Sequence, residues 1–377
     1  MRPLILIGAS VRAAAYSASR AGYAPYGIDL FADRDLAALG TAVKIARYPS
    51  EFLMALATAP QATWMYSGGL ENHPRLVDRL ANIRPLAGNP GHVLRQVRDP
   101  EQLMAAAIDA GCEFPKTLFS AADSLAAGKT WLIKPLRSSG GTGIRIAQPG
   151  KMVKLPRGTY LQEHIHGESA SAVFLAAGGR AKLIGATRQL LGRDVGLPLP
   201  FLYVGSFGPL PLNDSESARL RSLGNILAER FGLVGLFNID FVRQLDRLWI
   251  IEVNPRYSAS MEIIERVYDA NLIDWHLQAC ESGAQSASTE PTPLCHVGKI
   301  VVYARQNGVV PPSLDDLARQ WNSDPHSPGL ADLPRTGETL HAGQPVVTVL
   351  ASGDSAQTAD DLLQNRTATI EKLLADS

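Results

Sequence analysis

The stretch LWIIEVNPRYSAS, residues 248 to 260, places four apolar residues directly before a glutamate, with an asparagine, a proline and an arginine close behind. The apolar run predicts a buried strand, and an isolated buried charge is very costly. Glu252 at the end of that strand must therefore be paired, hydrogen-bonded or bound to a metal ion. The rest of the chain has to supply its partner.

A second acidic residue, Asp240, interrupts another apolar strand, LFNIDFV, twelve residues before Glu252. If residues 245–247 form a three-residue hairpin loop, Asp240 pairs directly with Glu252. Strand alternation then puts Asn254 on the same face as Glu252. Two carboxylates and an amide oxygen are hard ligands that suit Mg²⁺. The sequence therefore predicts a magnesium site at this hairpin.

A glycine-rich segment, WLIKPLRSSGGTGI, follows a different apolar strand over residues 131–144. Lys134 ends the strand, and glycines at 140, 141 and 143 allow backbone N–H groups to wrap phosphate oxygens. The lysine precedes the glycines, so this is not the GxxxxGK[ST] order of a P-loop. The segment predicts a phosphate-binding loop of another kind.

Each of these patterns also has a structural alternative. Asp240 and Glu252 can be ordinary salt-bridge partners of Arg243 and Arg256 at a sheet edge. The glycines can form a hairpin turn beside a surface lysine. His164 and His166 alternate on one strand, but no third metal ligand lies near them in sequence, which disfavours zinc.

Composition and charge restrict the classes of function open to the chain. Its 377 residues suggest two or three subdomains, and 36 basic against 36 acidic residues leave no basic surplus for general nucleic-acid binding. The three cysteines form no CxxC pair, which fits a reducing compartment. No stretch reaches the ~18 apolar residues of a membrane-spanning helix. We therefore expect a cytoplasmic protein with no nucleic-acid or membrane partner.

The order of elements indicates an α/β unit followed by an α+β unit. Over residues 1–90, apolar runs such as LILIG alternate with helical patterns, which predicts βαβ units and a parallel, Rossmann-like sheet. The turn after the first strand has only one glycine of the GxGxxG pattern, which disfavours a dinucleotide site. Residues 91–290 mix hairpins with helices, and residues 291–377 predict a small β-rich cap with a terminal helix. A linker is expected within SGAQSASTEPTP, residues 282–293.

Taken together, these motifs resemble the ATP-grasp superfamily. The resemblance rests on IKPLRSSGGTGI, YLQEHIHGESAS, FNIDFV and IIEVNPR, which occur in the family's order between residue 90 and about residue 290. It implies an ATP-grasp fold at residues 91–290, with residues 1–90 as the pre-ATP-grasp domain. It also implies ATP and Mg²⁺ or Mn²⁺ as cofactors, and small-molecule carboxylate and amine substrates. A homodimer is left open.

The resemblance assigns roles to individual residues. Lys134 would contact the nucleotide phosphates, over which the glycine loop closes; the loop comprises Ser138, Ser139, Gly140, Gly141, Thr142 and Gly143. The adenine edge would meet Glu163, His164 and Ile165, and Glu168 would hold the ribose hydroxyls. For Glu163 and Glu168, the alternative is an exposed glutamate on a strand.

The resemblance also implies that Asp240, Glu252 and Asn254 bind one or two Mg²⁺ ions. Arg256 would stabilise charge on an acyl phosphate through its planar fork of donors. One position departs from the family pattern, because Pro100 occupies the place of a frequent phosphate-binding lysine. Arg98 or Arg95 can substitute, or the contact is missing.

A narrower resemblance concerns the ATP-grasp carboligases that include the tyramine-glutamate ligases of methanofuran biosynthesis. It rests on EVNPRYSASMEI, YSGGLEN and the segment at residues 331–353. In that group the SGGLEN segment faces the cleft, so Ser67, Gly68, Gly69 and Glu71 are candidate substrate residues; a plain strand-to-helix turn is the alternative. We expect an ATP-dependent carboxylate–amine ligase. A kinase, a carboxylase and a non-catalytic nucleotide-binding regulator remain open.

Overall fold

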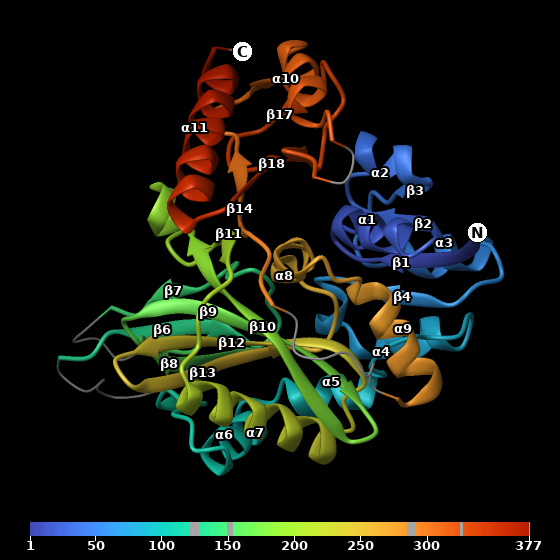
Figure 1. The fold of residues 1–377 in the computed structure, drawn as a ribbon. Coiled ribbons are helices and arrows are strands. Elements are labelled where there is room, and N and C mark those ends of the chain that lie inside the picture. Colours follow the sequence, from blue (N-terminus) through green and yellow to red (C-terminus); the bar gives the residue numbers. More distant parts are fainter. Residues whose placement is uncertain (121–127, 149–153, 285–291, 325–326, 377) are drawn as a thin grey trace.

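The computed structural model describes residues 1–120, 128–148, 154–284, 292–324 and 327–376. Most of the linker expected at residues 282–293 lies outside these ranges. The N-terminal part contains a four-stranded parallel sheet in the order β3-β2-β1-β4 (Figure 1). This confirms the parallel sheet predicted for the first 90 residues. The elements are β1 (Arg2–Ile7), α1 (Arg12–Arg20), β2 (Tyr23–Asp29), α2 (Arg34–Leu39), β3 (Thr41–Lys44), α3 (Phe52–Thr58), β4 (Trp64–Tyr66), η1 (Leu70–Asn72) and α4 (Pro74–Ala81).

An eight-stranded antiparallel sheet forms the centre of the molecule, in the order β13-β12-β9-β10-β11-β14-β18-β16. Its strands β14, β18 and β16 come from the C-terminal residues, and β14 pairs with β11. The sheet therefore continues across the proposed boundary at residue 290. The strands are β9 (Glu168–Ala177), β10 (Arg180–Leu191), β11 (Tyr203–Gly208), β12 (Gly235–Gln244), β13 (Arg247–Asn254), β14 (His296–Tyr303), β16 (Leu330–Ala331) and β18 (Pro345–Gly353).

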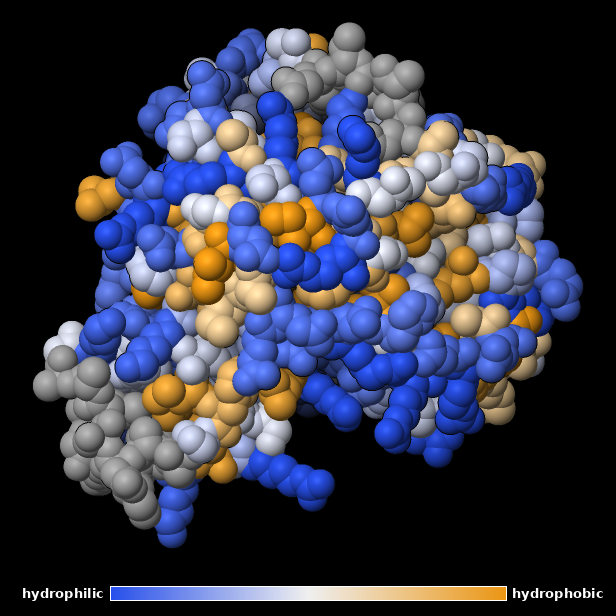
Figure 2. Space-filling model, turned by 90° about the horizontal axis from the view of Figure 1, so that it is seen from below, coloured by the Kyte–Doolittle hydropathy of each residue, from blue (hydrophilic) through white to orange (hydrophobic). Residues whose placement is uncertain are grey.

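A smaller four-stranded sheet, in the order β5-β8-β6-β7, carries the glycine-rich segment. Its strands are β5 (Thr117–Leu118), β6 (Trp131–Pro135), β7 (Arg145–Ile146) and β8 (Thr159–Glu163). Helices α6 and α7 lie below the large sheet in Figure 1, and this face is largely hydrophilic with small hydrophobic groups between (Figure 2). The nearby helices are α5 (Gly91–Val97), α6 (Pro100–Asp109), η2 (Gly192–Val195) and α7 (Asp214–Phe231).

One hydrophobic core joins the N-terminal sheet to the large sheet. Leu4 and Leu6 of β1 pack in the same cluster as Val173 of β9 and Ile264 of α8. This shared core holds the two sheets in a fixed relation. The remaining elements are α8 (Ala259–Tyr268), α9 (Leu272–Ser282), β15 (Gly308–Val309), α10 (Ser313–Trp321), β17 (Thr339–Leu340) and α11 (Ala356–Ala375). Within the ranges described, no helix combines the length and apolar character needed to cross a membrane.

Candidate active site

The β12–β13 hairpin pairs Asp240 with Glu252, as the sequence predicts. The predicted three-residue loop is wrong, because Gln244 pairs with Arg247 and the turn holds only two residues. A register shift restores the predicted pairing: Phe241 pairs with Ile250, so Ile251 is the extra residue of a β-bulge. The bulge therefore re-aims Glu252 toward Asp240.

The two carboxylates lie within a network of amide groups. Asn254 Nδ2 donates to Asp240 Oδ2 at 3.1 Å and to Glu252 Oε1 at 3.4 Å, and Asn238 Nδ2 donates to Asp240 Oδ1 at 2.7 Å. Burial and the charge of Glu252 raise the pKa of Asp240 to about 7. Two carboxylates that repel each other favour a nearby cation.

The salt-bridge alternative does not hold for these acids. Arg243 pairs with Glu168 at 3.2 Å and with Glu216 at 2.8 Å, and Arg256 pairs with Glu71. No ion pair among the described residues joins either arginine to Asp240 or Glu252. The described chain also contains no group of three His, Cys, Asp or Glu side chains placed to hold a metal ion. A metal at the hairpin would thus need amide, water or substrate oxygens as further ligands.

Lys134 is buried and lies at the end of β6, with only 7% of its surface exposed. Its Nζ donates to Gln162 Oε1 at 2.8 Å. The alternative of a surface lysine is therefore wrong. A buried ammonium with one neutral acceptor in contact has donors left for an anionic ligand.

The glycine loop adopts a conformation that other residues rarely take. Gly140, Gly141 and Gly143 have φ angles of 59°, 77° and 80°. A Cβ at Gly141 would lie 1.9 Å from the Phe201 carbonyl oxygen, and Tyr203 N donates to the Gly140 carbonyl at 2.9 Å. The loop thus packs closely on residues 201–203, and glycine at 141 permits that contact.

A single cavity of about 680 Å³ connects the hairpin, Lys134 and the glycine loop. Most of the residues expected from the sequence line it, namely Ser67, Gly68, Lys134, Ser138, Ser139, Gly140, Gly141, Thr142, Glu163, His164, Ile165, Asp240, Glu252, Asn254 and Arg256. Four expected residues do not line it, namely Gly69, Glu71, Gly143 and Glu168. The structure therefore brings together the expected metal residues, the expected phosphate residues except Gly143, and two of the four expected substrate residues, but not the expected ribose residue Glu168.

The two strand glutamates differ in position. Glu163 lines the cavity and pairs with Lys129 at 2.8 Å, whereas Glu168 pairs with Arg243 outside it. The ring of His164 lies 4.3 Å from that of His166, and burial, His166 and Arg193 lower the pKa of His164 to about 4. His164 is therefore uncharged at neutral pH. It directly follows β8, where the adenine of ATP is expected to bind.

The two arginines considered as substitutes for the missing lysine at Pro100 differ in position. Arg98 lines the cavity and donates to the Ser138 carbonyl at 3.2 Å and to Asn72 Oδ1 at 2.9 Å. Arg95 instead pairs with Asp78 at 3.5 Å and is about half exposed. Arg98 is thus the cation that reaches the glycine loop.

Glu71 of the SGGLEN segment accepts hydrogen bonds from Arg256. Arg256 Nε and Nη2 donate to Glu71 Oε1 at 3.1 and 2.7 Å, and Nη2 also donates to Asn254 Oδ1 at 2.9 Å. Ser67 Oγ donates to the Ser10 carbonyl at 2.7 Å. Glu71 therefore orients Arg256, and Ser67 and Gly68 form the cavity wall.

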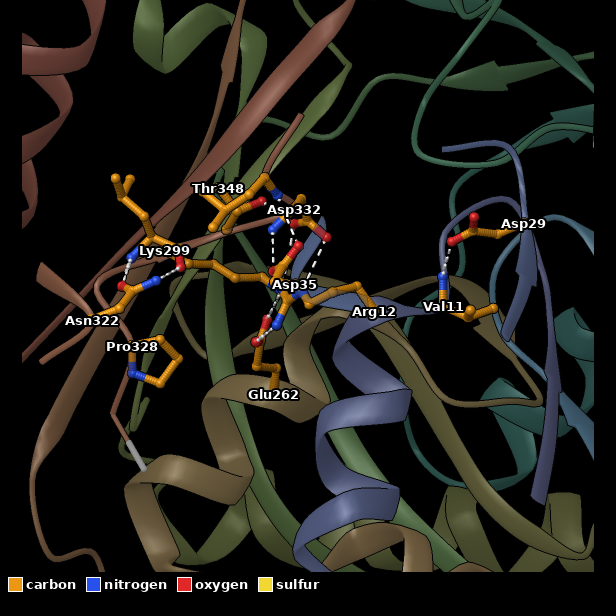
Figure 3. A network of polar contacts seen from close by, with 12 residues as sticks. Val11, Arg12, Asp29, Asp35, Glu262, Lys299, Asn322, Pro328, Asp332 and Thr348 are labelled. Carbon is orange, nitrogen blue, oxygen red and sulfur yellow. Dashed lines mark hydrogen bonds and ion pairs between the residues drawn. The ribbon is translucent and has the colours of Figure 1, made fainter. Parts of the chain in front are cut away.

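Figure 3 shows a largely buried cluster that the sequence does not reveal. Its residues Arg12, Lys299 and Asp332 line the same cavity. This Arg12 cluster comprises Arg12, Asp35, Glu262, Lys299 and Asp332. Arg12 donates to Glu262 Oε2 at 3.2 Å and to Asp332 Oδ1 at 3.0 Å, and Lys299 Nζ donates to Glu262 Oε2 at 3.0 Å. Burial raises the pKa of Glu262, but Arg12, Lys299 and Arg266 outweigh it and hold that pKa well below its usual range. The residues of this cluster are up to 320 positions apart in the sequence, so no local sequence pattern indicates their contact.

Comparisons with known proteins agree with this architecture. Residues 101–260 match the family model described as the ATP-grasp domain. An uncharacterized protein of Methanocaldococcus jannaschii is 24% identical over 229 residues, which are 59% of this chain and 51% of that protein. The chain thus spans about half the length of this curated relative.

Two solved structures resemble the chain over nearly its whole length. The L-amino acid ligase from Bacillus licheniformis has a TM-score of 0.70 at 14% identity, covering 97% of this chain and 96% of the ligase. The second is the biotin carboxylase domain dimer of the Hydrogenobacter thermophilus 2-oxoglutarate carboxylase, which was solved with MgADP, ADP and bicarbonate. Its TM-score is 0.69 at 14% identity, and the match covers 96% of this chain and 88% of the carboxylase chain. These matches confirm the ATP-grasp fold.

Proposed function

We propose that this chain, which contains an ATP-grasp domain, is an ATP-dependent ligase that joins a carboxylate to an amine. The observation that carries the proposal is that Asp240 and Glu252 line the same cavity as Lys134 and the glycine loop. In this arrangement, Lys134 and the glycine loop would bind an anion, and the two carboxylates would bind a cation in the same space. The resemblance to an amino acid ligase supports the choice of reaction, and the dimeric carboxylase supports a homodimer.

The residues of the cavity fit ATP and a divalent cation. Asp240 and Glu252 repel each other, and Asn238 Oδ1 is buried with no hydrogen-bond partner within the described chain. Asp240, Glu252 and, after rotation of its amide, Asn254 would hold one or two Mg²⁺ ions, for which Mn²⁺ can substitute. Mg²⁺ neutralises charge on the transferring phosphoryl group.

The remaining contacts to nucleotide follow from the cavity wall. Lys134, Arg98 and the loop from Ser138 to Gly143 would bind the phosphates. Glu163, His164 and Ile165 would meet the adenine, and Glu168 would hold the ribose only if it moves away from Arg243. The ribose role of Glu168 therefore requires its ion pair with Arg243, at 3.2 Å, to break.

In the proposed reaction, a carboxylate oxygen of the substrate attacks the γ-phosphorus and ADP leaves. The amine nitrogen then attacks the acyl carbon, phosphate leaves, and the nitrogen loses a proton. Arg256, oriented by Glu71, would stabilise negative charge on the acyl phosphate. No protein nucleophile is required, because positioning and electrostatic stabilisation dominate phosphoryl transfer.

We infer the substrates from the sequence resemblance to tyramine-glutamate ligases. On that basis, the carboxylate is glutamate or another amino acid, and the amine is small, in the biosynthesis of a one-carbon cofactor of the methanofuran type. The motifs EVNPRYSASMEI and YSGGLEN support this assignment. In the structure they supply Arg256 and its partner Glu71.

The experiment is a screen of carboxylates and amines for Mg²⁺-dependent ADP release. With the true pair, ADP and phosphate should form in equal amounts, and ¹⁸O from the labelled carboxylate should appear in the phosphate. Glu252→Gln should abolish turnover, whereas Asp246→Asn, at the exposed turn of the same hairpin, should not. Release of AMP and pyrophosphate would overturn the mechanism.

Other products would identify other functions. Dependence on bicarbonate would indicate a carboxylase, and a stable phosphorylated compound would indicate a kinase. If no pair supports turnover while ATP still binds, the chain is a nucleotide-binding regulator. Each of these results contradicts the ligase proposal.

A further inference from the structure

Asp33 occupies an unusual position at the end of the same cavity. It lies between β2 and α2, lines the cavity and has only 9% of its surface exposed. An aspartate directly before a helix normally accepts hydrogen bonds from the first turn, but the Asp33 side chain makes no such bond to α2. Within the described ranges, its carboxylate has no hydrogen bond or ion pair. The usual structural role of this residue is therefore absent.

The neighbouring acids are all engaged by the protein. Asp29 accepts from the backbone N–H groups of Val11 at 3.0 Å and Ala32 at 2.8 Å. Asp35 accepts from the N–H groups of Asp332 at 2.8 Å and Leu333 at 2.9 Å. Asp332 itself accepts from Arg12 and Thr348. Asp33 is thus the acid of this group that faces the cavity without a partner.

The electrostatic surroundings favour a cation at Asp33. Burial, Asp332, Asp35 and Asp29 raise the pKa of Asp33 to about 9, and Arg12 opposes them only in part. With that pKa, Asp33 is protonated at neutral pH while the cavity is empty. An ammonium ligand would favour release of this proton to the solvent and would then bind the carboxylate.

The chemistry of the cavity wall distinguishes an organic cation from a metal ion. A metal ion requires several oxygen ligands, but the acids around Asp33, namely Asp29, Asp35 and Asp332, already accept hydrogen bonds from the protein. One carboxyl group is thus left here, whereas the β12–β13 hairpin offers two and an amide. An ammonium group needs fewer acceptors, because it donates discrete hydrogen bonds. Phe31, two residues before Asp33, lines the same cavity with 39% of its surface exposed and can face a cation or an apolar group.

We propose that Asp33 and Phe31 form a subsite for an ammonium group of the acceptor substrate. The proposal rests on the ligase function only in naming the bound molecule as the acceptor. The carboxylate of Asp33 binds the charge, and the ring of Phe31 covers the adjoining apolar part. This end of the cavity is formed by the β2–α2 connection and the C-terminal strands, whereas the glycine loop lies on the smaller sheet.

The test measures binding without nucleotide, so it does not depend on turnover. The probe is benzylammonium chloride, with benzyl alcohol as the neutral analogue, titrated by ligand-observed NMR. Asp33→Asn should weaken benzylammonium binding about tenfold or more, as expected for loss of a charged hydrogen bond, and should leave benzyl alcohol unaffected. Asp316→Asn is the matched control, because Asp316 is an exposed acid paired with Arg319.

A second variant tests the subsite even if Asp33→Asn does not fold. Phe31→Leu should weaken benzylammonium while leaving n-butylammonium unchanged. The subsite is overturned if benzylammonium fails to bind the wild type, binds Asp33→Asn equally well, or binds no better than benzyl alcohol. If the subsite holds but the ligase screen fails, the cation site is retained and the reaction alone is rejected.

Discussion

Replacement of Arg12 by Met tests whether the Arg12 cluster stabilises the arrangement of the N-terminal and C-terminal parts of the chain. The substitution removes the guanidinium but keeps an unbranched side chain. Removal of one partner from a buried ion pair costs ~3–5 kcal/mol, because the other charge is left without compensation. Lys299 remains on Glu262 at 3.0 Å, and Asp35 keeps its two backbone N–H donors. We therefore expect the low end, about 3 kcal/mol.

The matched control is Arg2→Met. Arg2 pairs with Glu281 at 2.6 Å, but the two side chains are 59% and 48% exposed, so this pair should contribute under ~1 kcal/mol. Urea unfolding at pH 7, followed by tryptophan fluorescence and circular dichroism, gives the free energy of unfolding of each variant. If Arg12→Met loses no more free energy than Arg2→Met, burial does not strengthen the cluster and the reasoning is refuted.

Three further predictions concern the cavity and the cluster. Arg98→Ala should raise the KM for ATP about tenfold, as for loss of one charged hydrogen bond, whereas Arg95→Ala should not; equal effects would remove the role given to Arg98. Gly141→Ala should release the glycine loop from the Phe201 carbonyl, so that protease cleaves the loop even with Mg-ATP present. In the wild type, Mg-ATP should protect the loop from cleavage. Identical cleavage of the wild-type loop with and without Mg-ATP would argue for a static turn. The pKa of Glu262 is lowered in the folded state, so the stability that this carboxylate contributes is fully present above the pKa of glutamate in the unfolded chain and is lost as the pH falls through the folded value. Glu262→Gln should therefore lower the free energy of unfolding as much at pH 5 as at pH 7. A loss of stability that vanishes by pH 5 would contradict this.

That the residues expected to bind phosphate and metal gather at one cavity could be predicted, because they lie on short local motifs; their roles stay predictions. The pairing of Asp240 with Glu252 follows from strand alternation and a tight turn. The predicted loop length failed, because the sequence carries no clear signal for the bulge at Ile251, and the two errors in register cancelled. Glu168 was expected at the ribose, but its side chain is held by Arg243.

The Arg12 cluster and Asp33 could not be predicted, because each depends on contacts between distant segments. Arg12 and Asp332 are 320 residues apart and meet only after both sheets have packed. Asp33 looks like a helix cap in the sequence FADRD, and only the folded structure shows that its carboxylate leaves the helix unbonded. The limits at residues 90 and 290 stay predictions.

The pairing of β14 with β11 affects how the chain can be divided. A truncated chain that ended at residue 290 would leave β11 as an open strand edge with unpaired N–H and C=O groups. Such edges recruit strands from other molecules, so the shortened protein should associate and precipitate. The C-terminal residues therefore protect the large sheet from self-association. A protein engineered to carry this nucleotide site would have to include them.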